Sequence, residues 1–128
     1  MTVLLVAILG GVGAATRFVV DGSVRARWTR VFPLATLVVN VSGSFLIGLL
    51  AGAHLYRGLG PTWLVVAATG FCGGYTTFST AMVETVRLVQ AGEVRRATAN
   101  AVGSVVLCLG AAALGVAPTA RVVDPRPW

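Results

Sequence analysis

Four hydroxyl side chains follow two adjacent glycines in the stretch GFCGGYTTFSTA, residues 70–81, inside a long apolar run. Glycine weakens a helix, so Gly73-Gly74 predicts a break in any helix formed here. At membrane depth a broken helix is tolerated only where it is buried in protein or lines a cavity. Its carbonyl end suits a cation, and the new N-terminus suits an anion. The hydroxyls can bind an anion or cap the freed backbone; they are those of Thr76, Thr77, Ser79 and Thr80.

An aromatic residue, Phe78, lies among these hydroxyls. The edge of an aromatic ring is partly positive and can face an anion in a dry site. The alternative is that Phe78 packs in the core and that the hydroxyls bond back to carbonyls four residues earlier. The concentration of glycines, hydroxyls and an aromatic ring in one place favours ion handling.

A polar stripe runs along the second apolar segment. Thr36, Asn40 and Ser44 are spaced four apart, which places them on one helix face. Gly48 and Gly52 continue the line, and small residues at this spacing let a neighbouring helix approach closely. Two interpretations stay open: Asn40 is a packing contact between helices, or it lines a hydrated path.

The last apolar segment repeats the pattern with Asn100, Ser104 and Cys108 at the same spacing. These three side chains also share a helix face. Packing and a polar path are again both open, and Cys108 is a weak hydrogen-bonding partner.

Two charged residues lie at the edges of apolar segments. Arg17 can anchor at the interface or pair with Asp21 four residues later, or it can attract anions at the mouth of a pore. Glu84 lies three residues before Arg87, which favours a local ion pair. The alternative for Glu84 is a buried carboxylate that binds protons.

Composition places the chain in a membrane. Of 128 residues, 56% are hydrophobic and 11% are charged, whereas about a quarter of a soluble domain is charged. About 20 apolar residues cross a bilayer as a helix. The charge-free runs therefore predict one all-helical membrane domain over residues 1–128, with helices at about 2–20, 33–54, 61–90 and 96–117.

The net charge of +6 is interpreted as membrane topology and not as nucleic-acid binding, because no basic run is interleaved with aromatic residues. Six arginines fall in the turns near residues 25–30 and 87–96, and three fall on the other side, at Arg57, Arg121 and Arg126. The positive-inside rule then predicts cytoplasmic Arg-rich turns and both termini outside. The tail 118–128 is predicted to be an irregular surface segment.

Two processing features are expected to be absent. The first run has no preceding Lys or Arg and no good cleavage site, so it is not expected to be a signal peptide. Cys72 and Cys108 both lie within predicted helices, so no structural disulfide is expected.

Several strings resemble the Fluc/CrcB family of fluoride ion channels over nearly the whole chain. They are GGVGAATRF, PLATLVVNVSGSFLIGLL, GFCGGYTTFST and the polar spacing of the fourth helix. The resemblance implies an antiparallel dimer of four-helix subunits in a bacterial cell membrane, with two fluoride pores and a central structural sodium ion. It also implies passive export of cytoplasmic fluoride, which lowers fluoride toxicity.

The resemblance also implies roles for individual residues. Backbone carbonyls of Gly73 and Thr76 would hold the sodium ion, and Arg17 would stand at the vestibule. The fluoride pore would be lined by Asn40, Thr77, Phe78, Ser79, Thr80, Asn100 and Ser104. Glu84, Thr36 and Ser44 are further candidates.

Three residues depart from the family pattern. Ala81 stands where a second phenylalanine is expected, Asn100 where a tyrosine is usual, and Cys108 where a serine is usual. Together with the uneven arginine distribution, these departures raise the alternative of a non-conducting or half-active partner in a heterodimer with a homologue.

Two other classes are disfavoured. A small proton-coupled multidrug exporter needs a carboxylate midway along its first helix, and residues 2–16 contain none. An enzyme is not indicated, because the chain has no P-loop, no metal-ligand cluster and no nucleophile with a base. The single histidine, His54, falls at a predicted helix end and is interpreted as an interfacial residue.

Overall fold

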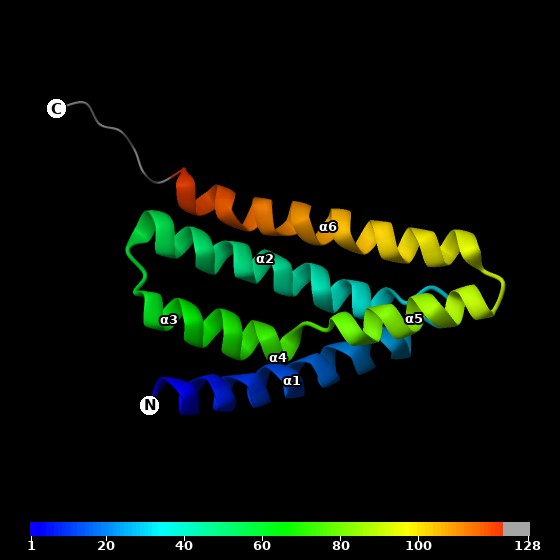
Figure 1. Cartoon of the computed structure of the whole chain (residues 1–128), viewed down its shortest axis with the longest axis horizontal. Helices are drawn as coiled ribbons and strands as arrows, with labels where there is room; N and C mark the ends of the chain where they lie inside the picture. Colours follow the sequence, from blue (N-terminus) through cyan, green and yellow to red (C-terminus); the bar gives the residue numbers. More distant parts are fainter. Residues whose placement is uncertain (122–128) are drawn as a thin grey trace.

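The computed structural model describes residues 1–121, which form helices joined by short turns (Figure 1). Three helices are unbroken: α1 (Thr2–Arg27), α2 (Leu34–Arg57) and α6 (Val94–Ala120). Each of the three is long and apolar enough to cross a membrane. The remaining segment consists of α3 (Pro61–Val65), the π-helix η1 (Val66–Cys72), α4 (Gly73–Tyr75) and α5 (Phe78–Gln90).

Three helices extend beyond their predicted ends: α1 to Arg27, α2 to Arg57 and α6 to Ala120. α1 continues to Arg27 because Asp21 and Arg25 pair one turn apart, at 2.6 Å, so these charges stabilise the helix instead of ending it. α6 contains Pro118 and continues to Ala120, so an irregular segment from residue 118 was a wrong prediction. Proline removes one backbone hydrogen bond, and only two helical residues follow Pro118, so little of the helix depends on that bond. Arg126 and the rest of the predicted tail lie outside the described residues.

The third predicted helix is broken near Gly73-Gly74, as predicted, but the two glycines are not themselves the break. Both glycines are helical, and the extended backbone lies at Thr76 (φ −78°, ψ 160°) and Thr77 (φ −148°, ψ 113°). Gly74 serves close packing instead, whereas a Cβ atom on Gly73 would meet only the Ala68 carbonyl, at 3.9 Å. A Cβ atom on Gly74 would collide with the backbone of Gly10 in α1, and one on Gly13 would collide with the carbonyl of Phe71.

Small residues also bring α2 against α6. A Cβ atom on Gly48 would collide with the backbone of Ala112, and one on Gly115 would collide with the carbonyl of Phe45. Gly52 lies against Thr119 in the same way. The prediction that Gly48 and Gly52 admit a neighbouring helix is confirmed, and the structure identifies that helix as α6.

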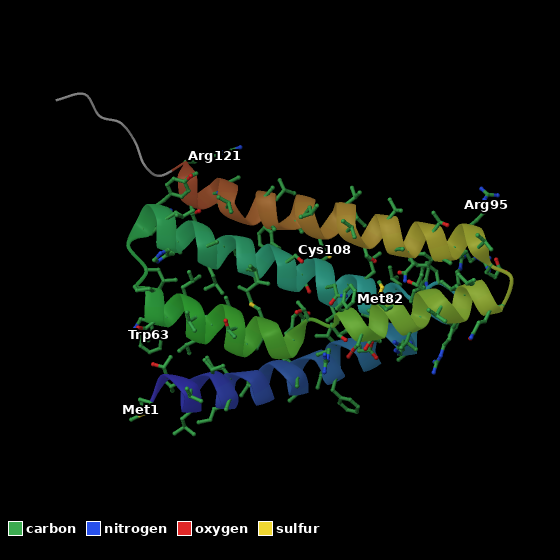
Figure 2. The ribbon with its side chains drawn as sticks, viewed as in Figure 1. Met1, Trp63, Met82, Arg95, Cys108 and Arg121 are labelled. Carbon is green, nitrogen blue, oxygen red and sulfur yellow. The ribbon has the colours of Figure 1, made fainter. Side chains whose placement is uncertain are left out.

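The two Arg-rich turns lie at the same end of the molecule. Figure 1 places the turn after α1 and the turn after α5 together, opposite the N-terminus and the turn after α2. Figure 2 shows Arg95 at the first end and Arg121 at the other. The predicted separation of the arginines within the fold is therefore confirmed. The two cysteines are free, as expected.

We predict that Gly74→Ala destabilises the fold, because the added methyl group must displace the α1 backbone; overpacking of this kind costs about 1–3 kcal/mol. Gly11→Ala is the matched control, since no atom lies within 4 Å of its added Cβ. Thermal unfolding in detergent measures both. Equal melting temperatures for the two variants would contradict the close approach of α1 and α4.

Candidate functional site

Asn40 on α2 binds the backbone N–H and carbonyl of Thr77, at the helix break, through the two ends of its side-chain amide. The Thr77 N–H donates to Asn40 Oδ1 at 2.7 Å, and Asn40 Nδ2 donates to the Thr77 carbonyl at 2.8 Å. In a continuous helix the Thr77 N–H would donate to the carbonyl four residues earlier. Asn40 therefore supplies the partner that the break removes, and buried backbone groups require such a partner.

The hydroxyls of Thr76 and Thr77 cap the two ends of the break. Thr77 Oγ1 accepts the backbone N–H of Thr80 at 3.3 Å and donates to Thr80 Oγ1 at 2.9 Å, which makes Thr77 the N-cap of α5. Thr76 Oγ1 donates to the Cys72 carbonyl at 2.9 Å, the back-bond to the preceding turn that was one of the sequence alternatives. Within this subunit both hydroxyls therefore make hydrogen bonds to backbone groups.

Arg17 reaches the break from α1. Its Nη1 atom donates to the Thr76 carbonyl at 3.1 Å. The alternative pairing of Arg17 with Asp21 is wrong, because Asp21 accepts two hydrogen bonds from Arg25 one turn further on. The guanidinium thus stands at the carbonyl end of the first half-helix, where a positive charge is favourable.

Two hollows meet at the break. The arginine cavity, of about 290 Å³, lies between α1, α2 and the start of α5; its polar lining is Arg17, Asp21, Arg25, Thr36, Thr77 and Thr80. The break groove, of about 270 Å³, lies between α2, α5 and α6. Its polar and aromatic lining is Asn40, Ser44, Thr76, Thr77, Phe78 and Ser104, joined by Ala81, Met82 and Cys108. Thr77 lines both hollows.

The break groove brings together much of the expected pore lining, namely Asn40, Thr77, Phe78 and Ser104, and also Ser44. The Phe78 side chain is 77% exposed in this subunit, so the alternative of a core phenylalanine is wrong for the single chain. Ser79 and Thr80 do not line the groove, although Thr80 lines the arginine cavity. Asn100 is buried beside it, 2% exposed, and its amide is bonded to α5.

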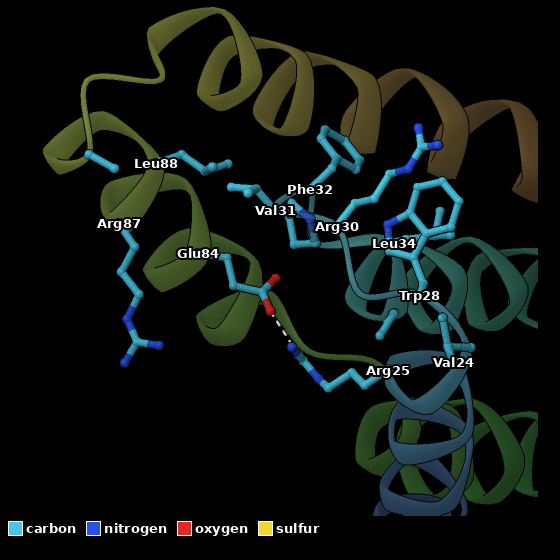
Figure 3. A pocket seen from close by; sticks show the side chains of 13 residues that line it. Val24, Arg25, Trp28, Arg30, Val31, Phe32, Leu34, Glu84, Arg87 and Leu88 are labelled. Atoms are coloured by element: carbon cyan, nitrogen blue, oxygen red, sulfur yellow. Dashed lines mark hydrogen bonds and ion pairs between the residues drawn. The ribbon is translucent and has the colours of Figure 1, made fainter.

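Glu84 is held by other helices and not by its neighbour in sequence. Its Oε1 atom accepts from Arg25 Nη2 and from Thr36 Oγ1, each at 2.9 Å. Figure 3 shows Glu84 facing Arg25 while Arg87 turns away, so the predicted pair of Glu84 with Arg87 is wrong. The Glu84 side chain is 14% exposed, and its Oε2 atom has no hydrogen-bond partner among residues 1–121.

The carbonyl end of the first half-helix has the chemistry of a hard-cation ligand. The Gly73 carbonyl loses its helical donor because the Thr77 N–H is bound to Asn40. The Thr76 carbonyl is already bound to Arg17, so a cation there would share this oxygen with a guanidinium. Residues 1–121 contain no cluster of His, Cys, Asp or Glu that could hold a metal ion. The fit to a small cation therefore rests on backbone oxygens.

Several contacts between helices were not foreseen from the sequence. Besides those of Glu84 with Arg25 and Thr36, they include Asn100 with Thr85, at 2.8 Å, and Ser42 with Tyr75, at 2.8 Å. Thr85 and Ser42 are hydroxyl residues within predicted membrane helices. A hydroxyl side chain in such a helix indicates that a hydrogen-bond partner exists, but the sequence does not show which helix supplies that partner.

The chain is similar to known proteins over most of its length. A family model described as CrcB-like protein, Camphor Resistance (CrcB), matches residues 4–116. "Fluoride-specific ion channel FluC 1" from Leifsonia xyli subsp. xyli is 49% identical over 99% of this chain and 93% of its own length. "Fluoride-specific ion channel FluC 2" from Mycolicibacterium paratuberculosis is 53% identical, over 86% of this chain and 87% of its own. "Fluoride-specific ion channel FluC" from Geobacter sulfurreducens is 46% identical over 84% of this chain and 88% of its own.

We predict that Asn40→Leu destabilises the fold, because it leaves the N–H and carbonyl of Thr77 unpaired; an unpaired group costs about 1–3 kcal/mol when fully buried, and these two are partly buried. Ser44→Ala is the control, since Ser44 lines the same groove. Substitutions at surface positions change the free energy of unfolding by about 0.5 kcal/mol or less. The measurement is the free energy of unfolding in detergent. Indistinguishable values for the two variants would show that the break holds without Asn40.

Proposed function

Because the chain belongs to the CrcB-like family, we propose that it is a subunit of a fluoride-specific ion channel through which cytoplasmic fluoride leaves the cell passively. The observation that carries the proposal is the break groove, which gathers hydroxyl, amide and aromatic groups at a helix break in a chain that matches this family over residues 4–116. Fluoride resistance is the expected consequence for the cell. No step requires an energy source.

Fluoride is strongly hydrated, so a selective path must replace its water with protein donors. The arginine cavity supplies positive charge at Arg17, which attracts an anion toward the break. The break groove then offers the hydroxyl of Ser104 and the exposed edge of Phe78. Asn40 uses one of its two N–H groups on Thr77, which leaves the second available to the ion.

Thr77 is the residue that connects the two hollows, since it lines both. Its hydroxyl already donates to Thr80 Oγ1. An anion that passes Thr77 would compete for this hydroxyl proton, so Thr80 Oγ1 and the ion would share one donor in turn, while Thr77 Oγ1 still accepts the Thr80 N–H of the cap. This exchange gives Thr80 and the neighbouring Ser79 an indirect part in the path.

We further propose that α3 to α5 form a fourth crossing, so that the subunit spans the bacterial cell membrane four times. Residues 61–90 would be about 45 Å long as one helix, which exceeds the hydrocarbon thickness of about 30 Å. The positive-inside rule would place the Arg-rich end in the cytoplasm. An antiparallel second subunit would cover Phe78, which is 77% exposed in the single chain.

A structural sodium ion would fit the carbonyl end of the break. The oxygens of Gly73 and Thr76 would hold it, and its charge would stabilise the carbonyl ends of two half-helices brought together in a dimer. Arg17 already donates to the Thr76 carbonyl, so the ion would depend on the Gly73 oxygen more than on the Thr76 oxygen.

A second candidate is a partner subunit in a heterodimer. Ala81 lines the groove without an aromatic edge, so this chain provides one phenylalanine there and not two. The Arg-rich turns after α1 and α5 lie at one end of the molecule (Figure 1), while Arg57 and Arg121 lie at the other, and this bias favours one fixed orientation in the membrane. A multidrug exporter is not proposed, because the first carboxylate of α1, Asp21, is bound to Arg25.

The test of the proposed function is fluoride efflux from liposomes that contain the purified chain alone, and from liposomes that also contain a homologue from the same genome. We expect rapid efflux, selective over chloride, from the chain alone. Efflux only with the homologue would support the heterodimer. Absence of fluoride efflux from both kinds of liposome would contradict the proposal that the chain is a channel subunit.

Within that assay, we predict that Phe78→Ala lowers fluoride efflux at least tenfold, because it removes the ring edge from the break groove. Phe45→Ala is the matched control, since Phe45 is also exposed on the molecule but lies outside this groove. Equal losses in both variants would point to folding and not to the pore.

We predict that exchanging sodium for a large organic cation lowers the fraction of dimer, measured by light scattering in detergent, because the carbonyl ends of two half-helices would then face each other without a cation. Potassium serves as the control for ionic strength. An unchanged dimer fraction would contradict a structural sodium ion and would leave the flux assay to judge the channel.

A further inference from the structure

A buried amide joins α5 to α6 beside the break groove. The Asn100 side chain is on α6 and is 2% exposed. Its Nδ2 atom donates to Thr85 Oγ1 at 2.8 Å and to the Ala81 carbonyl at 3.4 Å. Thr85 Oγ1 in turn donates to the same Ala81 carbonyl at 2.8 Å. Asn100, Thr85 and the Ala81 carbonyl are called the amide triangle below.

The amide triangle contains the only side-chain hydrogen bonds between α5 and α6 within residues 1–121. The surfaces around it are small and apolar: Ala81 is 4% exposed and Ala97 is 2% exposed. Alanine surfaces allow close approach but do not select one register of two helices. Buried hydrogen bonds are directional, so the triangle fixes where α6 lies along α5.

The position of α6 determines the shape of the break groove. Ala81 and Ala101, which lie at the triangle or next to it in sequence, line the groove. Ser104 and Cys108 follow Asn100 at the four-residue spacing of one helix face, and both line the groove as well. A shift of α6 at Asn100 would therefore carry these two side chains away from Phe78 on α5.

We infer that Asn100 is a positioning residue that sets the width of the break groove and, through that width, the discrimination between fluoride and larger anions. Asn100 does this through Thr85 and the Ala81 carbonyl, since it does not itself line the groove. The part of the inference that concerns anions rests on the proposed function. The part that concerns groove width does not.

The chain carries its own reporter of this width. Cys108 lines the groove and is partly exposed, whereas Cys72 is fully buried at 0% exposure. The full-length chain in lipid vesicles would be treated with a methanethiosulfonate reagent, and mass spectrometry would follow the labelling rate of each cysteine. Loss of the triangle should raise the Cys108 rate, while Cys72 stays unlabelled as long as the chain is folded.

Asn100→Leu removes the amide at similar volume, and Thr85→Val removes one hydroxyl while the amide stays. We expect the labelling rate of Cys108 to rise on the order of tenfold in Asn100→Leu, as the loss of a pair of net-favourable hydrogen bonds implies, and by less in Thr85→Val. Thr98→Val is the matched control, since Thr98 is exposed on α6. Asn100→Gln, which keeps the amide, should restore much of the parental rate.

The ratio of fluoride to chloride flux, measured in the same vesicles, should fall in Asn100→Leu and recover in Asn100→Gln, a pattern that general destabilisation would not produce. Unchanged Cys108 labelling in both Asn100→Leu and Thr85→Val would overturn the inference. If Cys72 becomes labelled in Asn100→Leu, that variant is unfolded and Thr85→Val decides. If the parental chain carries no fluoride, the proposed function fails, and the labelling rates still decide whether Asn100 sets the groove.

Discussion

The backbone N–H and carbonyl of Thr77 need hydrogen-bond partners between apolar helices, and the structure around the break depends on how they are supplied. Asn40 supplies both an acceptor and a donor, at 2.7 and 2.8 Å, from a different helix. This pairing lets α4 end and α5 begin without leaving a buried backbone group unpaired. It also fixes Thr77 between the arginine cavity and the break groove, so one interaction that satisfies the backbone also determines where two polar hollows meet.

Close helix packing makes that interaction possible. Glycines at positions 10, 13 and 74 let α1 lie directly against η1 and α4, and Arg17 can then reach the Thr76 carbonyl. Glycines at 48 and 115 draw α6 onto α2 in the same way. In an apolar environment there is little hydrophobic drive between helices, so close backbone contact and a few polar links hold the bundle together. Each polar link consequently has a large influence on geometry.

The polar residues of α2 show how one stripe serves several elements. Thr36 binds Glu84 on α5, Asn40 binds the break, and Ser44 lines the groove. Glu84 also receives Arg25, which is bound to Asp21, so α1, α2 and α5 are linked at the Arg-rich end by one network of charges. Packing contacts and groove lining overlap along this stripe: Thr36 and Asn40 hold neighbouring elements in place, and Asn40 and Ser44 both line the groove that the proposed function assigns to fluoride.

The amino-acid sequence by itself determined the class of the protein. Its charged residues are too few for a soluble domain, and its long apolar runs have the length of helices that span a membrane. The quoted strings also determined the family, which the match over residues 4–116 confirms. Tertiary structure decided the rest. A glycine permits either a break or a close approach, and only the position of α1 shows that Gly74 serves the approach while the break falls at Thr76 and Thr77. Spacing along one helix predicted ion pairs of Arg17 with Asp21 and of Glu84 with Arg87, but long side chains also reach neighbouring helices. Their actual partners, the Thr76 carbonyl and Arg25, became available only when the helices packed together.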